Sequence, residues 1–527
     1  MVAGQESLVT PNIQQFQIPS HWLTQADFRL DATYYTSHAI WASMLVRESD
    51  FLVKPLSDKE VLAGPPFWPP RFKRIYTPDR QMGKPFISAN ETFMLRPEKR
   101  RWVAVKQVQD LDNYLLRPGW ILMSRSGTIG RCRLVTPYLE TYLVTDDLMR
   151  ILPALPSGYI YAFLSSWIGQ ALIKKQQYGA TVTHIEPHHL KDIPIPILPK
   201  NEREAIHKQV EHAYRLRDEA NLLLDQAEAL LYQELELPQF DDSKVPYLFS
   251  YTKPQAFTVE ASHLQNRFDA SYHIPRARAA LSILGEGRYN LVPLKDLADP
   301  FIPPRFKRIY VESEYGVPFL QGSHVPMIKP FDIKYLSRAA HKNLEPWIIK
   351  AGWVMITCSG TIGRIALVPK QWEGWAASQH IERIVPKDKN QAGYIAAFLM
   401  TPYGQIQLAS KVYGGVVDEL TAEDTGAIMI PDAPADDVQR KIGDLVLAAY
   451  ENNAKAIKEE DEAIANFERT LEERFVQKGL TPFRPREKTL EDAMRATWSA
   501  NWEISSAQVE ADVQEAISSA IENSEQP

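Results

Sequence analysis

Cysteine and long apolar runs are the two features that this sequence of 527 residues most lacks. It has only two cysteines, Cys132 and Cys358, so a disulfide framework is excluded and a metal centre would need other ligands. No run of about 18 apolar residues is present, which excludes a membrane-spanning helix. The N-terminus has no basic segment followed by an apolar one, so we expect no export signal. These absences predict a cytoplasmic protein in a reducing compartment.

Catalytic motifs are also missing. The sequence has no glycine-rich phosphate loop, no H-E-x-x-H metal motif and no G-x-S-x-G nucleophile motif. The N/D-P-P-Y pocket motif that an adenine methyltransferase needs is absent as well. We therefore expect no catalytic residue, no metal and no cofactor in this chain. An enzyme with an unrecognised motif is the first alternative, and cleavage or methylation of DNA by the protein alone would favour it.

The sequence does contain a long internal repeat. The octapeptide PPRFKRIY occurs at Pro69–Tyr76 and again at Pro303–Tyr310, an offset of 234. Three further segments recur in the same order: FRLDATYY (Phe28–Tyr35) with NRFDASYH (Asn266–His273), SGTIGR (Ser126–Arg131) with the same hexapeptide (Ser359–Arg364), and GYIYAFLSSWIGQ (Gly158–Gln170) with GYIAAFLMTPYGQ (Gly393–Gln405). Solenoid repeats are about 20 to 50 residues long, so this period indicates two duplicated domains related by an approximate two-fold axis.

Proline-rich segments and hydrophobic stripes divide the chain. Each domain ends on a proline-rich segment that cannot be helical, and an amphipathic stripe that follows it predicts a long helix. Asn201 and Asp436 have the spacing of helix caps. We predict an α+β protein in which two α/β domains are joined by two antiparallel, coiled-coil-like helices of about 50 Å each. The segments are 15–199 (first domain), 200–237 (first spacer helix), 255–432 (second domain), 435–476 (second spacer helix) and 477–527 (an acidic C-terminal extension).

Positive charge is concentrated at the same place in each repeat. The net charge of the chain is −6, but residues 61–131 carry 13 Lys and Arg against 5 Asp and Glu. Residues 301–364 carry 9 against 4. The alternative is that these side chains only solvate the surface. Because the segregation occurs twice against an acidic background, we favour a binding site for a polyanion.

The order of the motifs identifies a family resemblance. R-x-D-A-x-Y-Y is followed by a basic stretch, then P-G-W or A-G-W with SGTIGR, then Y-I-x-A-F-L-x-x-x-x-G-Q, a Tyr-Gly pair (Tyr178-Gly179, Tyr413-Gly414), IPIPILP and a long helix. Over residues 20–475 this order resembles the specificity subunit of type I restriction–modification systems. The resemblance implies two target-recognition domains that read the halves of a split DNA sequence, held apart by a dimerised helical spacer.

The same resemblance implies the partners. They are double-stranded DNA, two methyltransferase (modification) subunits and a restriction or translocase subunit, acting in antiviral defence. The subunit itself has no activity, so S-adenosylmethionine and ATP are expected only on the partner subunits. The second alternative is a non-catalytic adaptor of another anti-phage complex that has weakened or lost DNA binding.

Residues that are identical in both domains suit contacts to DNA phosphates, because they cannot by themselves distinguish two half-sites. The candidates for backbone contact are Arg71, Lys73, Arg74, Arg131, Arg305, Lys307, Arg308 and Arg364. In the alternative interpretation, Phe72 and Phe306 anchor a core strand and the neighbouring charges face solvent. For SGTIGR a structural role is favoured, since its small residues permit tight turns.

Divergent polar residues at aligned positions are the candidates for base reading. Arg suits the edge of guanine, Asn and Gln suit adenine, and Asp accepts a hydrogen bond from cytosine. The candidates are Asn90, Arg96, Lys99, Arg100, Arg101, Asp146, Asp147, Gln321, Ser323, His324, Lys329, Lys334, Gln379 and His380.

Overall fold

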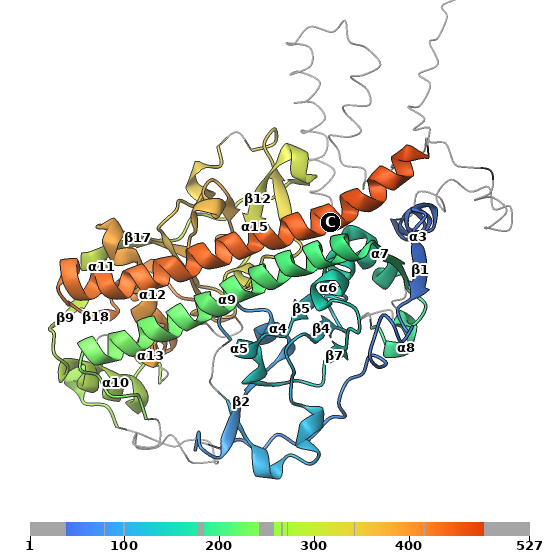
Figure 1. The fold of residues 1–527 in the computed structure, drawn as a ribbon. Helices are drawn as coiled ribbons and strands as arrows, with labels where there is room; N and C mark the ends of the chain where they lie inside the picture. Colours follow the sequence, from blue (N-terminus) through green and yellow to red (C-terminus); the bar gives the residue numbers. More distant parts are fainter. Residues whose placement is uncertain are drawn as a thin grey trace, which may run out of the picture.

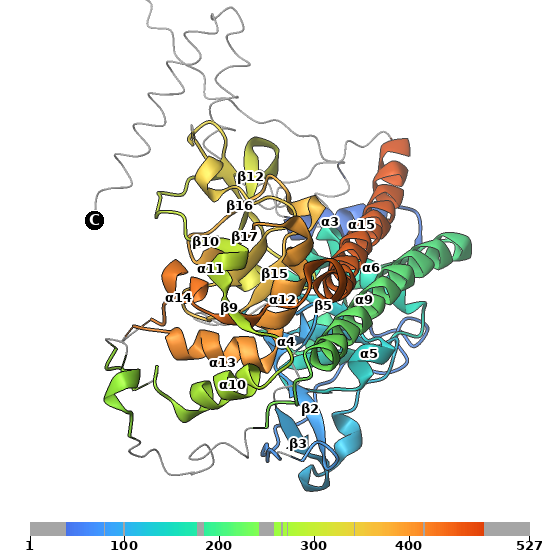
Figure 2. The same cartoon turned by 90° about the vertical axis from the view of Figure 1, so that its left-hand side faces the viewer.

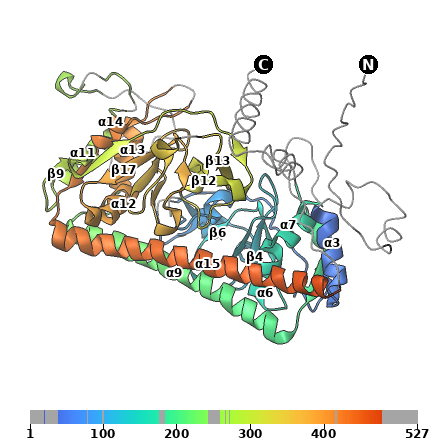
Figure 3. The same ribbon diagram turned by 90° about the horizontal axis from the view of Figure 1, so that it is seen from above.

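Two units of mixed helix and strand lie on the same side of a pair of long helices (Figures 2 and 3). The computed structural model describes residues 20, 38–77, 79–97, 101–175, 184–241, 258–264, 267–270, 272–341, 343–414 and 417–478. The predictions for Phe28–Tyr35, for Tyr178-Gly179 and for the acidic extension lie outside the described residues.

The first unit contains three small sheets. Its strands are β1 (Leu52–Pro55), β2 (Gly83–Ile87), β3 (Trp102–Ala104), β4 (Ile121–Ser124), β5 (Cys132–Leu134), β6 (Leu143–Val144), β7 (Leu148–Ile151) and β8 (Pro194–Ile197). Its helices are α3 (His38–Glu48), α4 (Ala89–Thr92), α5 (Pro137–Glu140), α6 (Ser157–Ser165), α7 (Trp167–Lys174) and α8 (Pro187–Leu190). The strand orders are β5-β4-β7, β3-β2-β6 and β1-β8, and β2 pairs with β6 in parallel. The prolines of β8 lack amide donors, so this strand pairs on one side only.

The second unit repeats this topology and extends two of the sheets. Its strands are β9 (Leu291–Pro293), β10 (Ala298–Phe301), β11 (Tyr310–Val311), β12 (Gly316–Leu320), β13 (Lys334–Ser337), β14 (Val354–Thr357), β15 (Ile365–Leu367), β16 (Ala376–Ala377), β17 (Ile381–Pro386) and β18 (Met429–Pro431). Its helices are α10 (Pro275–Gly285), α11 (Leu294–Leu297), α12 (Ala392–Met400), α13 (Pro402–Lys411) and α14 (Ala422–Gly426). The orders β15-β14-β17 and β13-β12-β16 recur, with β10 and β11 added at their edges. The mixed helix and strand content predicted from the sequence is confirmed.

Helices α9 (Lys200–Glu234) and α15 (Arg440–Gln477) run antiparallel along the whole molecule (Figure 1). Asn466 Nδ2 donates to Gln209 Oε1 at 3.3 Å near one end, and Asn452 Nδ2 donates to Glu219 Oε2 at 3.5 Å nearer the other. Equivalent apolar positions of the two stripes are buried, namely Ile206 and Ile442, Val210 and Val446, and Ala213 and Ala449. The buried side chains of both helices therefore follow the apolar spacing of the sequence.

The helix caps predicted at Asn201 and Asp436 are wrong. Helix α9 starts directly after Pro199, and the π-helical turn Ala435–Gln439 that leads into α15 starts directly after Pro434. Neither start has a side-chain cap. The fixed φ of proline suits the residue before a helix start, so each helix begins two positions earlier than the capping pattern indicates.

The two units also touch each other directly. The amide of Leu95 donates to the carbonyl of Pro326, and the amide of Ile328 donates to the carbonyl of Phe93, both at 2.9 Å. These bonds are reciprocal, because Phe93 and Leu95 occupy the repeat positions of Pro326 and Ile328. Such reciprocity is the signature of a two-fold contact. The helices are therefore not the only connection between the units.

Among the helices that the structure describes, none is long and apolar enough to cross a membrane.

Candidate nucleic-acid interface

The octapeptide of the first unit is held by the turn that follows β6. Arg71 Nε lies 3.2 Å from Asp146 Oδ2, and Arg74 Nη2 lies 3.1 Å from Asp146 Oδ1. The carboxylate of Asp146 is buried, whereas the side chain of Arg71 is 80% exposed and also lies 3.9 Å from Asp147. We call Arg71, Arg74, Asp146 and Asp147 the first arginine cluster.

The second unit builds a similar arrangement, in which the partner of Arg308 is neutral. Arg308 Nη2 donates to Gln379 Oε1 at 2.6 Å, and Gln379 contacts the ring of His380 at 3.1 Å. The side chain of Arg305 is 81% exposed, and its nearest acid is Glu419 at 3.9 Å. We call Arg305, Arg308, Gln379 and His380 the second arginine cluster. The structure therefore brings together residues predicted for two separate roles, backbone contact and base reading.

A buried arginine fixes the turn in each cluster. Arg150 donates to the carbonyls of Val144 and Thr145, each at 3.0 Å, and Arg383 donates to the carbonyl of Ser378 at 2.8 Å. The two arginines are fully buried, and each lies in the strand after the turn that it holds. The sequence interpretation missed them, although the shared arginine of VTDDLMRI and ASQHIERI was a signal for them.

The phenylalanine of each octapeptide packs inward. Phe72 lies 4.5 Å from the ring of Tyr114, and Phe306 lies 4.3 Å from the ring of Trp347, measured between centroids. The anchoring role considered for these residues is therefore observed, but residues 69–75 form no strand. Anchored phenylalanines hold the flanking cationic side chains at the surface: Lys73 and Lys307 are exposed in both octapeptides.

The SGTIGR hexapeptides form tight turns. Gly130 and Gly363 both have positive φ, 81° and 82°, and an added Cβ would lie 3.1 and 3.0 Å from the amide of Gln170 or Gln405. Those glutamines donate to the carbonyls of the two glycines at 2.7 and 2.9 Å. The repeated G-Q motif therefore serves to hold the SGTIGR turn.

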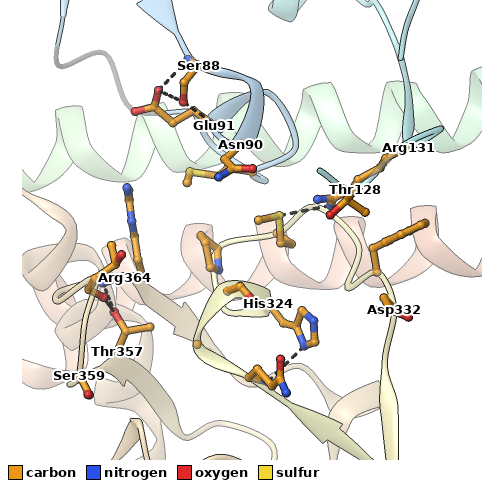
Figure 4. A pocket seen from close by; sticks show the side chains of 18 of the residues that line it. Ser88, Asn90, Glu91, Thr128, Arg131, His324, Asp332, Thr357, Ser359 and Arg364 are labelled. Atoms are coloured by element: carbon orange, nitrogen blue, oxygen red, sulfur yellow. Dashed lines mark hydrogen bonds between the residues drawn. The ribbon is translucent and has the colours of Figure 1, made fainter. Parts of the chain in front are cut away.

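Most of the remaining candidates line a cavity between the units (Figure 4). These are Asn90, Arg101, Arg131, Gln321, Ser323, His324, Lys334 and Arg364. Burial, and next the neighbouring Arg131, lowers the pKa of His324, which favours its neutral form at pH 7.

Arg96 and Lys329 contact the spacer helices instead. Arg96 Nε donates to Asp225 of α9 at 2.9 Å, and Lys329 Nζ lies 2.6 Å from Asp461 of α15. These equivalent pairs fasten each unit to a helix, a placement that favours a structural role over base reading. Lys99 and Arg100 lie outside the described residues. In the described part of the chain, no group of His, Cys, Asp or Glu has the arrangement of a metal site.

Comparison with known proteins finds a matching family. Residues 290–465 match the family described as "Type I restriction modification DNA specificity domain". No curated protein matches the chain. The resemblance to the specificity subunit of type I restriction–modification systems is confirmed by this match, which lies within the second unit and the helix that follows it.

Solved structures of the same class are also similar. The type I restriction–modification S subunit of M. genitalium shares 13% identity over 81% of this chain and 96% of that chain, with a TM-score of 0.34. The HsdS subunit of Thermoanaerobacter tengcongensis shares 14% identity over 81% and 96%, with a TM-score of 0.25. A chain from a study of complex assembly and conformational transition of the type I R-M system shares 12% over 80% and 97%, with a TM-score of 0.24.

Proposed function

We propose that this chain is the DNA-recognition subunit of a multisubunit methyltransferase or restriction enzyme and reads a bipartite target. The observation that carries the proposal is the pair of equivalent arginine clusters, one in each unit. The clusters adjoin β2 and β12, which lie on opposite sides of the molecule (Figures 1 and 2). Two separated basic sites on one rigid support suit two separated half-sites on one duplex.

Each cluster combines the two kinds of contact that DNA recognition needs. The guanidinium groups of Arg71 and Arg305 are exposed and suit phosphates, which position a protein without specifying sequence. The neighbouring turn carries Asp147 in one unit and Gln379 with His380 in the other, so the groups offered to base edges differ between the units. Two different half-sites follow from this difference.

The partners follow from the family. A chain that binds DNA without catalysing its modification acts by delivering enzymes, which we take to be two methyltransferase subunits and a restriction or translocase subunit. S-adenosylmethionine and ATP would then be bound by those subunits. The competing proposal, an adaptor that no longer binds DNA, differs in one measurable property, which is the affinity of the purified chain for duplex DNA.

Selection of bound duplexes from a randomised library tests the proposal. We expect the selected sequences to contain two short blocks at a fixed separation, and the affinity to fall steeply as salt rises, because phosphate contacts release counterions. Library members with the blocks scrambled serve as the control. No enrichment, together with no binding at low salt, would leave the adaptor as the correct function.

A further inference from the structure

A cavity of about 840 Å³ lies between the two units. Its walls come from equivalent segments of both units: Asn90 lines it with Ser323, and Thr128 with Thr361. Arg131 and Arg364 form a third such pair (Figure 4). Each pair occupies matching positions of the repeat, so the cavity lies on the approximate two-fold axis. A volume of this size is within the range of ligand sites, which is about 300 to 1,000 Å³.

Among the residues that the structure describes, the contacts that hold the Arg131 guanidinium include no carboxylate. Its guanidinium stacks on the ring of Phe93 at 4.2 Å, and Nη2 contacts Met327 Sδ at 3.2 Å and the carbonyl of Lys329 at 3.3 Å. None of these three groups carries a negative charge. Burial lowers the pKa of Arg131 to about 10, which leaves it charged at neutral pH. The side chain is therefore a fixed positive charge at the cavity wall.

The other charged groups leave the cavity positive. Arg101, Lys334 and Arg364 add three cations, against the carboxylates of Glu91 and Asp332. Glu91 is already engaged, since it accepts from the amide of Ser88 at 2.8 Å and pairs with Arg101. Four cations therefore face two acids, and Glu91 also acts electrostatically on Arg364 of the second unit.

The donors of this cavity suit one chemical group. Guanidinium and hydroxyl groups from both units line the cavity, and this combination binds phosphate oxygens better than it binds a neutral ligand. We propose that the cavity binds phosphoryl groups, with Arg131 contacting them from the first unit and Arg364 from the second. Two sources share this chemistry, namely the backbone of a DNA duplex and a free phosphorylated small molecule.

The symmetry of the cavity suits the duplex. The two strands of DNA are related by two-fold axes, and binding sites commonly share the two-fold symmetry of their protein. One arginine would then contact each strand in the segment between the two half-sites. This form of the inference rests on the proposed function. If the ligand is duplex DNA, four candidates for base reading support phosphate binding instead and do not read the base sequence: Asn90, Gln321, Ser323 and His324.

The test uses the full chain with Arg131→Gln and with Arg364→Gln. Arg338→Gln is the matched control, because Arg338 is exposed, lies outside the cavity and gives the same change of charge. Calorimetry with pyrophosphate at constant ionic strength tests the free ligand. We expect each cavity variant to bind about 10- to 100-fold more weakly than the control, the effect of removing one hydrogen bond to a charged group.

The DNA source is tested by the salt dependence of binding to a random duplex. If the backbone is the ligand, the slope of log K against log salt should fall by about 0.9 for each arginine removed, while Arg338→Gln keeps the wild-type slope. Melting curves check folding. If Arg131→Gln melts early, Thr361→Val removes a hydroxyl donor from the cavity wall without altering the packing of Arg131.

The outcomes separate this inference from the proposed function. Weaker binding of pyrophosphate, or a reduced salt slope with DNA, supports the phosphoryl site when it is seen for either arginine variant. The experiment that shows the effect identifies which of the two ligands the cavity binds. A wild-type chain that binds pyrophosphate in the cavity but binds no DNA would sink the proposed function alone. If both variants behave as Arg338→Gln does with pyrophosphate and with DNA, the cavity is no phosphoryl site, even if the chain binds DNA tightly.

Discussion

The two arginine clusters show how one peptide acquires two electrostatic environments. The octapeptides are identical, yet Arg74 meets the carboxylate of Asp146 and Arg308 meets the neutral amide of Gln379. A buried carboxylate between two arginines cancels part of their charge, whereas an amide only orients its partner. The repeat therefore sets the position of the basic side chains. The turn opposite them sets their effective charge. Equal sequence at the peptide therefore does not produce an equal electrostatic environment.

The two ends of the helix pair also differ in charge. Arg217 of α9 and Glu460 of α15 form a buried ion pair, and Tyr161 of the first unit donates to Glu460 at 2.9 Å. The equivalent positions at the other end hold Asn453 and Leu224, which cannot form such a pair. Lys329 of the second unit also lies 3.0 Å from Glu460. One carboxylate therefore joins both helices and both units, and it breaks the two-fold symmetry.

The largest expected effect comes from removing that carboxylate. In Glu460→Leu, Arg217 stays buried without a counter-charge, which should lower the free energy of unfolding by about 3–5 kcal/mol. The double variant Arg217→Asn with Glu460→Leu installs the residue types of the other end and should recover most of that stability, since apolar replacement of a buried pair is often neutral. Urea unfolding measures both. Equal stability of the single and double variants would contradict the ion pair as the cause.

The same carboxylate makes a prediction for acid pH. Burial alone would raise the pKa of Glu460, but Arg217 and next Lys329 lower it to about 2. A folded pKa below the unfolded value of about 4.5 contributes stability above that value. We therefore expect the contribution to disappear as pH falls from about 4.5 to about 2, and the double variant to lose less stability in that window. Unfolding free energies measured across these pH values check the sign.

A second buried acid, present in only one of the two units, has a pKa that is raised where that of Glu460 is lowered. Glu382 of β17 is fully buried and accepts from Thr425 at 2.8 Å, where the first unit has Met149. Burial raises its pKa to about 8. The folded state then keeps a proton that the unfolded chain releases above about 4.5, so stability falls as pH rises from about 4.5 to about 8.

Glu382→Gln should remove this dependence. We expect it to be more stable than the wild type at pH 8 by roughly 2–4 kcal/mol and similar near pH 4.5, because the amide has no charge to bury. Glu423→Gln is the control, since Glu423 is an exposed acid nearby. Chemical unfolding at the two pH values makes the comparison. A gain of the same size at both pH values would rule out titration of Glu382 as its origin.

Local sequence patterns predicted the parts of the fold that depend on neighbours in the chain. The repeated motifs occur in both units, and the two apolar stripes coincide with α9 and α15. The caps at Asn201 and Asp436 failed because Pro199 and Pro434 start the helices earlier, a competition between two local signals. Sequence patterns therefore located the elements well and their first residues less well.

Local sequence patterns could not predict the contacts between segments that lie far apart in the chain. The pairing of Arg71 with Asp146 joins residues 75 positions apart, and the bridge between the units at Met94 and Met327 joins residues 233 apart. Nothing in a single sequence fixes which surface turns meet. The division of the candidate residues into phosphate and base contacts depends on such pairings and stays a prediction. Arg150 and Arg383 were missed because a buried arginine has no local pattern of its own.

A smaller effect is expected from removing the octapeptide charges, and it should differ between the units. Arg305, Lys307 and Arg308 changed to Ala should weaken binding to all DNA sequences and reduce the salt slope by about 0.9 for each phosphate that is no longer bound, with little change in melting. The same change at Arg71, Lys73 and Arg74 leaves the buried carboxylate of Asp146 without these partners, so this variant should also melt earlier.

A compensating substitution separates the loss of stability from the loss of DNA affinity in the first unit. Adding Asp146→Gln to the first-unit triple variant installs the residue type of the second unit and should restore melting without restoring DNA affinity. The two triple variants are compared by melting curves and by salt titration of binding. If both melt alike and show the same reduced slope, the acid opposite the first octapeptide has no influence, and the contrast drawn between the clusters is wrong.

The smallest expected effect is a change of preference at one half-site. Exchanging Asp146 and Asp147 for Gln and His gives the first turn the residues that Gln379 and His380 provide in the second. Arg74 keeps its place, because the amide of Gln379 orients Arg308, the equivalent arginine of the second unit. The salt slope should change by less than about 0.9, since no phosphate-binding cation is removed. Each altered base contact should change discrimination by about 1–3 kcal/mol at that half-site alone. Selected-duplex sequencing of the variant reports both halves together, so the unaltered half serves as the internal control. An unchanged preference in both halves would show that these turns position the arginines and read no base.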